Sequence, residues 1–291
     1  MISIQGITKR FGDHQALAGV DLEVPEGSVQ GLLGPNVAGK TTTVRVLTTL
    51  LDPDAGEAIV AGHSAITAGH EVRRRLGVSG QYAAVDERLT GFENLTMVGE
   101  LYGMRRRDAK ARARELLRDF RLDDVAETKR AGAYSGGMRR RLDLALSFVV
   151  TPEVLFLDEP TTGLDTRSRR DLWDLIRTVA ATGTTVFLTT QYLEEADHLA
   201  DRIAVLHAGR IAALGTPAEL KARVGGDTVE LHDAQGELIR EIPTDGTVAD
   251  LRRALDLLDE EGLDGVVTLR RPTLDDVFLA VTTSPRAQEI A

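Results

Sequence analysis

The stretch LLGPNVAGKTTT, residues 32–43, constrains the fold of this chain more than any other part of the sequence. Gly34, Gly39, Lys40 and Thr41 match the pattern G-x-x-x-x-G-K-[ST]. A loop of this kind wraps nucleotide phosphates with backbone amides, and it lies between a strand and the N-terminus of a helix. An ordinary glycine-rich turn in front of a helix is the alternative reading of these residues.

The neighbouring residues supply the expected strand and helix. Residues 29–33 are a short β-type run that predicts a buried strand, and Val44, Leu47 and Leu51 have the spacing of one helix face. We expect this helix to end at Asp52-Pro53, because proline disfavours helical geometry in the residue before it. Further buried strands are predicted at 57–60, 154–157, 185–189 and 203–206. The alternation of strands and helices indicates an α/β fold.

The composition excludes several classes of function. The 35 basic and 45 acidic residues give a net charge of −10, which argues against nucleic acid as a partner. No cysteine is present, so disulfides, zinc thiolates and cysteine nucleophiles are excluded. The N-terminus does not resemble a signal peptide, and the apolar stretch 142–150 is far shorter than the roughly 20 residues that span a bilayer. We therefore expect a soluble chain that reaches a membrane only through a partner.

The chain is expected to have a large domain, 1–224, and a small α+β appendage, 225–291. The composition shifts near residues 224–227, and beyond them TVELHD, ELIREIP and GVVTLRRP read as strands around a helix at 248–258. LDDVFLAV, residues 274–281, reads as an amphipathic helix whose apolar face must pack against another element. Residues 105–117 predict an exposed amphipathic helix, and its RRRDAKARAR run reads as a solvated face.

Chemistry at the loop follows from its amides and side chains. Amides from Asn36 to Thr41 would face the β-phosphate at the positive end of the helix dipole. Lys40 would reach the β- and γ-phosphates, and the Thr41 hydroxyl would bind Mg²⁺. VLFLDEP places Asp158 and Glu159 at the end of a buried strand. Asp158 would hold Mg²⁺ through water, and Glu159 could polarise an attacking water molecule.

A second helix N-terminus lies in YSGGMRRRLDLAL, residues 134–146. Ser135 is placed to cap this helix, with the small residues Gly136 and Gly137 exposing the backbone beside it. Met138, Leu142, Ala145 and Val149 form the apolar stripe behind that end. Such a terminus is a second anion site, and one domain has no evident need of two unless the second serves another copy.

At these residues the sequence resembles the ABC ATPase family, whose signature motif begins with Ser-Gly-Gly. The resemblance covers roughly residues 2–220 and implies a RecA-like core with a parallel sheet, an antiparallel β part and an inserted helical subdomain at about 85–150. It also implies that two copies pack head to tail, so that each signature motif closes over ATP held by the other copy. The Gly-Leu-Asp at 163–165 matches the D-loop at that interface.

The same resemblance assigns the site residues. ATP would contact Phe11, Gly34, Pro35, Asn36, Val37, Ala38, Gly39, Lys40, Thr41, Thr42, Gln81, Ser135, Gly136, Gly137, Asp158 and Asp165. Mg²⁺ would be held by Thr41, Gln81 and Asp158, and hydrolysis would use Glu159, Gln191 and Lys40. Phe11 matches the aromatic residue that stacks on adenine, although the residue taken on its own favours a simple core position over a binding role.

Two residues depart from the family pattern. Val37 stands where the family most often has glycine, and a positive φ there would cost about 1–3 kcal/mol for a β-branched residue. That strain would weaken ATP binding roughly ten- to a hundredfold, so Val37→Gly is expected to tighten it. Gln191 stands where the family has a histidine facing the γ-phosphate. Glutamine donates a hydrogen bond but cannot become cationic, so hydrolysis should lack a histidine-type titration near pH 6.5.

YSGGMRRRLDLA, DEPTTGLD, LTTQYLEEADHLADRIAVL and RRPTLDDVFL together resemble the ATP-binding subunits of daunorubicin/doxorubicin-resistance exporters. That resemblance implies an ATP-hydrolysing subunit, peripheral on the cytoplasmic face of the membrane, that drives drug efflux through a separate membrane permease docked on the helical subdomain. The appendage would then be a regulatory or assembly element. A lipid or polysaccharide substrate, a low-turnover nucleotide switch, and an ABC ATPase acting on ribosomes or DNA are the alternatives.

Overall fold

The computed structural model describes residues 1–81 and 84–283 of the chain. These residues form two compact units, Met1–Leu214 and a second unit that begins at Gly215. The second unit begins earlier than the sequence analysis expects, because helix α8 (Pro217–Val224) packs against α10 (Leu274–Thr283) within it. The glycines after α8 lie at the end of a helix within the second unit. A composition shift looks the same at a helix end as at a domain boundary, so the sequence alone did not separate the two.

A six-stranded sheet with the order β10-β9-β3-β8-β7-β6 is the centre of the first unit. Its strands are β3 (Val29–Leu33), β6 (Leu76–Ser79), β7 (Val154–Asp158), β8 (Thr185–Thr190), β9 (Arg202–His207) and β10 (Arg210–Gly215). The strands from β9 to β6 are parallel to one another. Every residue of β3, β7 and β8 is buried, because this sheet is covered on both faces.

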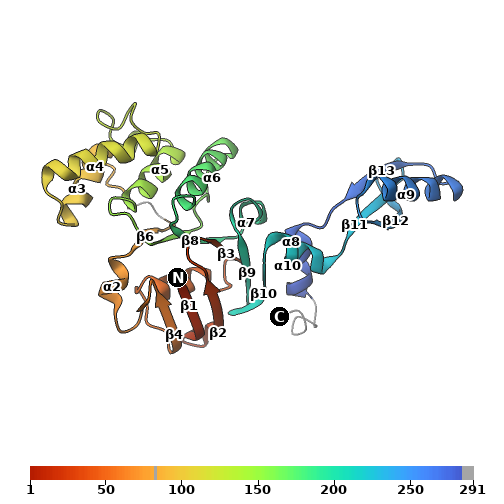
Figure 1. Ribbon diagram of the computed structural model, residues 1–291, viewed down its shortest axis with the longest axis horizontal. Helices are drawn as coiled ribbons and strands as arrows, with labels where there is room; N and C mark the ends of the chain where they lie inside the picture. The colour runs from red at the N-terminus through yellow and green to blue at the C-terminus, as the bar shows by residue number, and fades with distance from the viewer. Residues whose placement is uncertain (82–83, 284–291) are drawn as a thin grey trace. The chain divides into compact units, whose positions relative to one another are not determined.

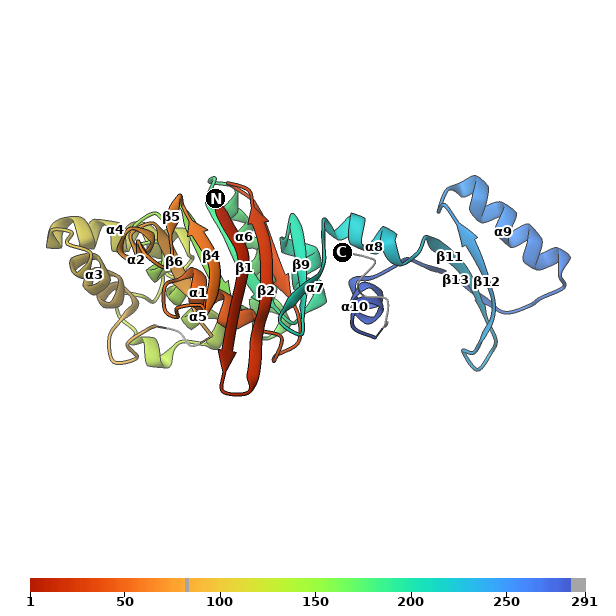
Figure 2. The same ribbon diagram turned by 90° about the horizontal axis from the view of Figure 1, so that it is seen from below.

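A second sheet, with the order β2-β1-β4-β5, lies below the first in Figure 1. Figure 2 shows its long strands β1 and β2 at full length. It comprises β1 (Ile2–Phe11), β2 (His14–Val24), β4 (Ala55–Val60) and β5 (His63–Ser64). A strand was predicted at 57–60 and is present in β4, but the prediction that it is buried was wrong, since only Ala58 and Val60 of β4 are buried. An antiparallel sheet can keep one face in water, which a short apolar run does not reveal.

Two hydrophobic clusters follow from the alternation of side chains along the parallel strands. Phe156 and Phe187 pack with the four-stranded sheet and with helix α1 (Lys40–Leu47), their ring centroids 5.6 Å apart. Leu155 and Leu188 point to the other face and pack with helices of the second cluster. Besides α1, the helices described in the first unit are α2 (Gly69–Arg73), α3 (Gly91–Leu101), α4 (Arg106–Asp119), η1 (Ala131–Ala133), α5 (Gly136–Leu146), α6 (Thr166–Ala180) and α7 (Leu193–Leu199).

Helices α3, α4 and α5 pack against one another and lie side by side in Figure 1, within the range expected for the helical subdomain. The α4 helix is amphipathic as predicted: Ala109, Ala113, Leu116 and Leu117 are buried, and most of its arginines face outward. The α3 helix begins with a capping box, in which Thr90 accepts from the Glu93 amide and Glu93 accepts from the Thr90 amide.

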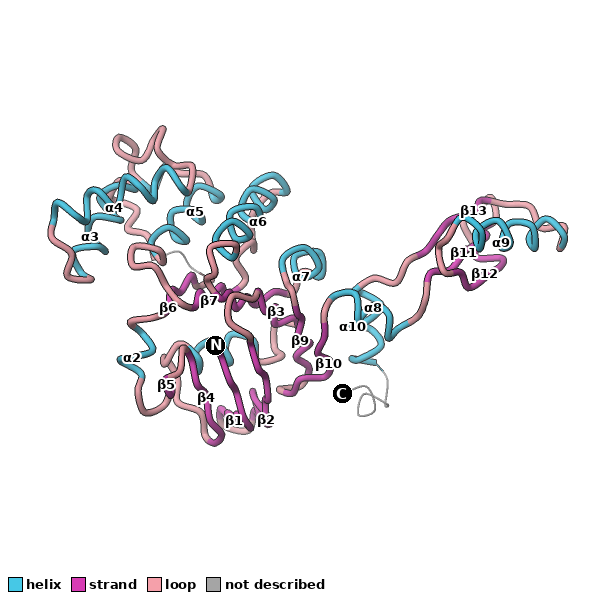
Figure 3. The backbone as a smooth tube through the Cα atoms, viewed as in Figure 1, coloured by secondary structure: helices cyan, strands magenta, loops and turns pink. Residues whose placement is uncertain are grey.

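The second unit contains a three-stranded sheet, seen in magenta in Figure 3, with the order β12-β11-β13. Its elements are β11 (Asp227–His232), β12 (Leu238–Thr244), α9 (Val248–Glu260) and β13 (Val266–Arg270). Val229 and Leu231 pack with Ala254 and Leu258 of α9. The strands and helix predicted for this part of the chain are confirmed. The 274–281 helix buries Leu274, Val277 and Val281.

Candidate functional site

The residues that the sequence singled out follow four neighbouring parallel strands. The phosphate loop follows β3, Gln191 follows β8, Asp158 ends β7 with Glu159 next to it, and Gln81 lies just beyond β6. These strands are adjacent in the order β3-β8-β7-β6. Because the carboxyl ends of parallel strands share one edge of the sheet, the topology gathers these residues there, where open α/β sheets bind ligands.

The phosphate loop runs into the N-terminus of α1, which has no side-chain cap. The helix begins at Lys40, and Gly39 before it provides no side-chain cap for the first amides. Gly39 has φ +106°, and a Cβ there would lie 2.5 Å from the Ala16 carbonyl oxygen and 2.8 Å from Leu17 Cδ2. The glycine is therefore required both by backbone conformation and by the close approach of the loop to β2.

The expected strain at Val37 is absent. Val37 does not occur among the non-glycine residues with positive φ in the described chain, and its side chain is 80% exposed. A β-branched residue with a negative φ carries no left-handed penalty. The family pattern suggested a conformational need for glycine here, whereas the conformational need lies at Gly39. The expectation of backbone strain at Val37 was therefore wrong, and with it the reason given for weaker ATP binding.

Lys40 lies along the loop with its ammonium group buried, and its residue is 3% exposed. The ammonium nitrogen donates to the carbonyls of Gly34 (2.7 Å) and Pro35 (3.1 Å). It also lies 3.3 Å from Glu159 Oε1. A buried ammonium needs such partners, and the contact places the cation of the phosphate loop beside the carboxylate that follows β7.

Asp158 connects three elements at the same edge. Its Oδ1 accepts from the Thr189 hydroxyl at 2.5 Å and from the Thr41 hydroxyl at 3.4 Å. Mg²⁺ is usually held by one or two carboxylates together with substrate phosphates and water, so Asp158 beside Thr41 fits that ion. The described residues contain no group of three histidine or acidic side chains that could hold a metal by themselves.

Glu159 has a left-handed backbone, with φ +49°. Its amide donates to the carbonyl and to the hydroxyl of Thr189, both at 3.1 Å. The Glu159 conformation costs about 1–3 kcal/mol for a non-glycine residue, and such residues cluster at functional sites. The neighbouring peptide bonds must therefore be held in place by other groups.

The remaining predicted residues of this edge have less defined contacts. Gln81 is exposed directly beyond β6, and Gln191 is partly buried beyond β8. Phe11 ends β1 in the four-stranded sheet and is 47% exposed, so it is not a core residue. This exposure leaves the Phe11 ring accessible, and Lys9 Nζ lies 5.9 Å from the ring centroid.

The signature residues open α5, as the sequence predicted. Ser135 caps the helix by accepting from the Met138 amide at 3.2 Å. A Cβ on Gly137 would lie 2.6 Å from Ser168 Oγ, so this glycine permits close packing of α5 on the first turn of α6. Asp165 caps α6 by accepting from the Ser168 amide and hydroxyl, both at 2.9 Å, and these hydrogen bonds lower the pKa of its carboxyl. The signature motif and the D-loop are thus one packed unit.

Several residues of the site were not found from the sequence. Thr189 binds both Asp158 and the Glu159 amide, and two polar residues closing an apolar strand are a signal that could have found it. Arg140 of α5 is buried and donates to the Asp158 and Pro160 carbonyls, and Asp143 of the same helix is buried beside Arg140. Arg140 lies in a run of three arginines, and nothing in that run distinguishes it from its neighbours.

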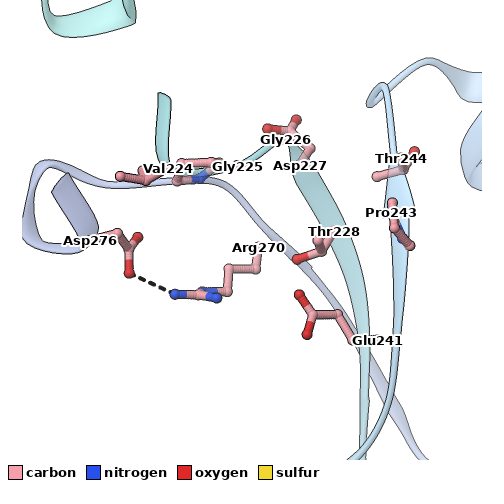
Figure 4. Close-up of a pocket in the computed structure, with 11 residues that line it drawn as sticks. Val224, Gly225, Gly226, Asp227, Thr228, Glu241, Pro243, Thr244, Arg270 and Asp276 are labelled. Carbon is pink, nitrogen blue, oxygen red and sulfur yellow. Dashed lines mark hydrogen bonds and ion pairs between the residues drawn. The ribbon is translucent and has the colours of Figure 1, made fainter. Parts of the chain in front are cut away.

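A separate pocket of about 260 Å³ lies in the second unit, and it contains none of the predicted site residues. Figure 4 shows Asp227, Glu241, Arg270 and Asp276 around it, with Arg270 and Asp276 paired at 2.7 Å. Three of these four charged groups already have ion-pair partners, since the neighbouring Arg271 lies 3.4 Å from Asp227. The phosphate loop remains the candidate site.

Comparisons with known proteins agree with this geometry. The family model described as ABC transporter matches residues 17–162. The daunorubicin resistance ATP-binding protein DrrA3 of Streptomyces coeruleorubidus is 51% identical, with 98% of this chain and 96% of the relative covered. The daunorubicin/doxorubicin resistance ATP-binding protein DrrA of Streptomyces peucetius is 49% identical over 98% of this chain and 93% of the relative.

Solved structures show the same fold. An ATP-binding cassette solved as a dimer in a post-hydrolysis state with ADP and Pi matches with a TM-score of 0.67 and 24% identity, covering 74% of this chain and 98% of that one. None of the helices within residues 1–81 and 84–283 has the length and apolar character needed to cross a bilayer. The chain belongs to the ABC transporter family.

Proposed function

We propose that this chain is the ATP-hydrolysing subunit of an exporter that moves a drug-type compound through a separate membrane permease. One observation carries the catalytic part of the proposal: Lys40, Asp158 and Glu159 meet at one edge of the parallel sheet, with Lys40 Nζ 3.3 Å from Glu159 Oε1. The drug-type cargo is supported by the two relatives, whose names state daunorubicin or doxorubicin resistance.

ATP would bind with its phosphates at the first turn of α1. The amides of the loop from Gly34 to Thr42 and the Lys40 ammonium group would bind phosphate oxygens, exchanging the carbonyl contacts of Lys40 for charged ones. Phe11, which is accessible at the end of β1, would stack on the adenine.

Mg²⁺ would be held by the Thr41 hydroxyl, the Asp158 carboxylate and Gln81. When bound, the ion neutralises charge on the β- and γ-phosphate oxygens. Thr189 keeps the Asp158 carboxylate oriented through its 2.5 Å hydrogen bond. The donor set consists of oxygen atoms, which suits a hard divalent cation.

Glu159 would orient the attacking water and accept its proton. Its carboxylate lies 3.3 Å from the Lys40 ammonium group, inside the proposed phosphate site. Gln191, from the end of β8, would donate a neutral hydrogen bond to the γ-phosphate. Lys40 would stabilise the charge that develops during phosphoryl transfer.

A second copy of the chain would complete each nucleotide site. The exposed α5 N-terminus carries Ser135 and Gly136, with Gly137 packed behind them and Asp165 at the neighbouring turn. The hydrogen bonds of Ser135 and Asp165 stay within their own helical turns. The exposed amides of α5 are therefore placed to bind a phosphate held by another molecule. The dimeric cassette with the same fold supports this arrangement.

The permease would dock on the helical subdomain and hold the chain at the cytoplasmic face of the membrane. The net charge of −10 supports a protein partner over a nucleic acid. Copurification of the chain with an integral membrane protein tests this part of the proposal. Recovery of the chain with ribosomes or DNA instead would contradict it.

Replacement of Glu159 by Gln tests the catalytic assignment. We expect this variant to bind ATP like the parent chain and to lose at least about 100-fold in kcat, because the amide cannot accept the proton. Steady-state phosphate release and equilibrium binding of a fluorescent ATP analogue measure the two quantities. Unchanged turnover in Glu159→Gln would contradict the assignment, and negligible turnover in the parent chain would favour the low-turnover switch.

A further inference from the structure

Arg140 is a buried cation that the proposed mechanism does not use. It lies on the second turn of α5, directly behind the signature residues, and it is 8% exposed. Desolvation lowers the pKa of its guanidinium group, while the charges of Asp143, Glu195 and Asp158 oppose that effect. A buried guanidinium remains charged in proteins, so its five N–H donors require acceptors.

Those donors hold the backbone on both sides of Glu159. Nε donates to the Pro160 carbonyl at 2.7 Å, and Nη2 donates to the Asp158 carbonyl at 3.4 Å. The planar guanidinium therefore binds the carbonyls of the two residues on either side of Glu159. Because Glu159 has φ +49°, the direction of its side chain depends on the main chain at Asp158 and Pro160 staying in place.

The same guanidinium reaches the segment that carries Gln81. Nη1 donates to the Gly80 carbonyl, and it also lies 3.4 Å from Asp143 Oδ2. Asp143 is 2% exposed, and it accepts from the Ser79 hydroxyl at 2.5 Å and from the Ala84 amide at 2.6 Å. The Arg140–Asp143 pair thus binds the main chain on both sides of Gln81 as well as on both sides of Glu159.

We propose that Arg140 is a positioning residue for Glu159, and that the Arg140–Asp143 pair couples the position of Glu159 to the Gln81 segment. The inference rests on the proposed role of Glu159 as the base. The signature helix would then have two functions. The N-terminal end of α5 would bind the nucleotide of another copy, and its second turn would hold the main chain around Glu159 in its own copy.

Arg141 provides a matched control on the same helix. Its Nη1 donates to the Arg121 carbonyl at 2.8 Å and to the Phe120 carbonyl at 3.5 Å, at the end of α4. Arg141 therefore binds main-chain carbonyls as Arg140 does, but away from Glu159. Loss of either guanidinium removes similar bonds from α5, and only the loss of Arg140 should affect the position of the base.

The experiment compares Arg140→Gln, Arg140→Lys and Arg141→Gln in the full chain, with kcat and KM for MgATP measured by phosphate release. We expect Arg140→Gln to lower kcat roughly 10- to 100-fold with KM within about twofold, because displacing a catalytic group by 1 Å can cost about 100-fold. Arg140→Lys keeps the charge opposite Asp143 and loses the planar fork, so it should fold normally and show an intermediate kcat. Arg141→Gln should retain kcat within about twofold.

Epistasis with Glu159 separates positioning from a general effect on structure. In the Glu159→Gln background, measured by single turnover of labelled ATP, Arg140→Gln should lower the residual rate by less than about twofold. The same 10- to 100-fold loss in both backgrounds, or full activity in Arg140→Lys, would overturn the inference. Full activity in Glu159→Gln would instead refute the proposed base, so the two failures are distinguishable.

Discussion

Val37 shows why a residue type can suggest strain that the backbone does not have. The loop has its positive φ at Gly39, whereas Val37 lies with a negative φ and an exposed side chain. A Val-to-Gly change there removes no strain and adds backbone freedom to the unliganded loop.

We therefore expect Val37→Gly to leave ATP affinity within about threefold of the parent value. Equilibrium titration with a fluorescent ATP analogue measures this difference. Binding that is tighter by tenfold or more would show that valine strains the loop after all.

Glu195 is a carboxylic acid whose properties are set by burial. It is fully buried in α7, and its Oε1 accepts from Trp173 Nε1 at 3.0 Å. Burial raises the pKa of this carboxyl above its ordinary value, and hydrogen bonds and the charge of Arg169 oppose that effect. The folded protein therefore holds the Glu195 proton more tightly than the unfolded chain does.

The sign of the resulting pH dependence follows from that difference. The contribution of Glu195 to stability is fully present below pH 4.5 and is lost as pH rises through the higher folded-state pKa. Glu195→Gln cannot titrate, so its melting temperature should gain on that of the parent chain as pH rises through this window. Thermal unfolding between pH 4 and 8 checks this, with the exposed Glu194→Gln as a control for the loss of a carboxylate. A difference independent of pH would contradict the prediction.

At the scale of elements, α5 and α6 are joined through the signature glycines. The Cβ built on Gly137 lies 2.6 Å from Ser168 Oγ, whereas the Cβ built on Gly136 has its nearest neighbour, Leu164 Cδ2, at 3.6 Å. The two adjacent glycines therefore have different structural requirements, although the sequence presents them as equivalent.

Gly137→Ala should destabilise the chain by about 1–3 kcal/mol, because the added methyl group overpacks the contact with α6. Gly136→Ala is its matched control and should be neutral or stabilising by about 1 kcal/mol or less, since alanine favours a helix. Urea unfolding of both variants measures the difference. Equal stabilities for the two variants would show that α5 can move away from α6 at no cost.

At the scale of the whole molecule, the sequence predicted the central features well. The strand at 29–33 and the phosphate loop were placed correctly, because a buried parallel strand is a continuous apolar run and the loop has a distinctive spacing. The 57–60 strand was predicted to be buried and is half exposed, because its apolar run does not specify which sheet it joins. Long-range contacts were not predictable: Arg140 reaches Pro160, and Asp143 reaches Ser79, through packing that no local pattern encodes.

The central claim is that each nucleotide site is shared by two copies of the chain. The chain has no cysteine, so Val37→Cys can be introduced in the loop of one copy and Arg139→Cys in the first turn of α5 of another, both in the Glu159→Gln background. A short bis-maleimide should join the two copies when MgATP is present and leave them separate without it, with each variant alone as the control. Crosslinking that does not respond to ATP, in chains shown to bind ATP, would contradict the account.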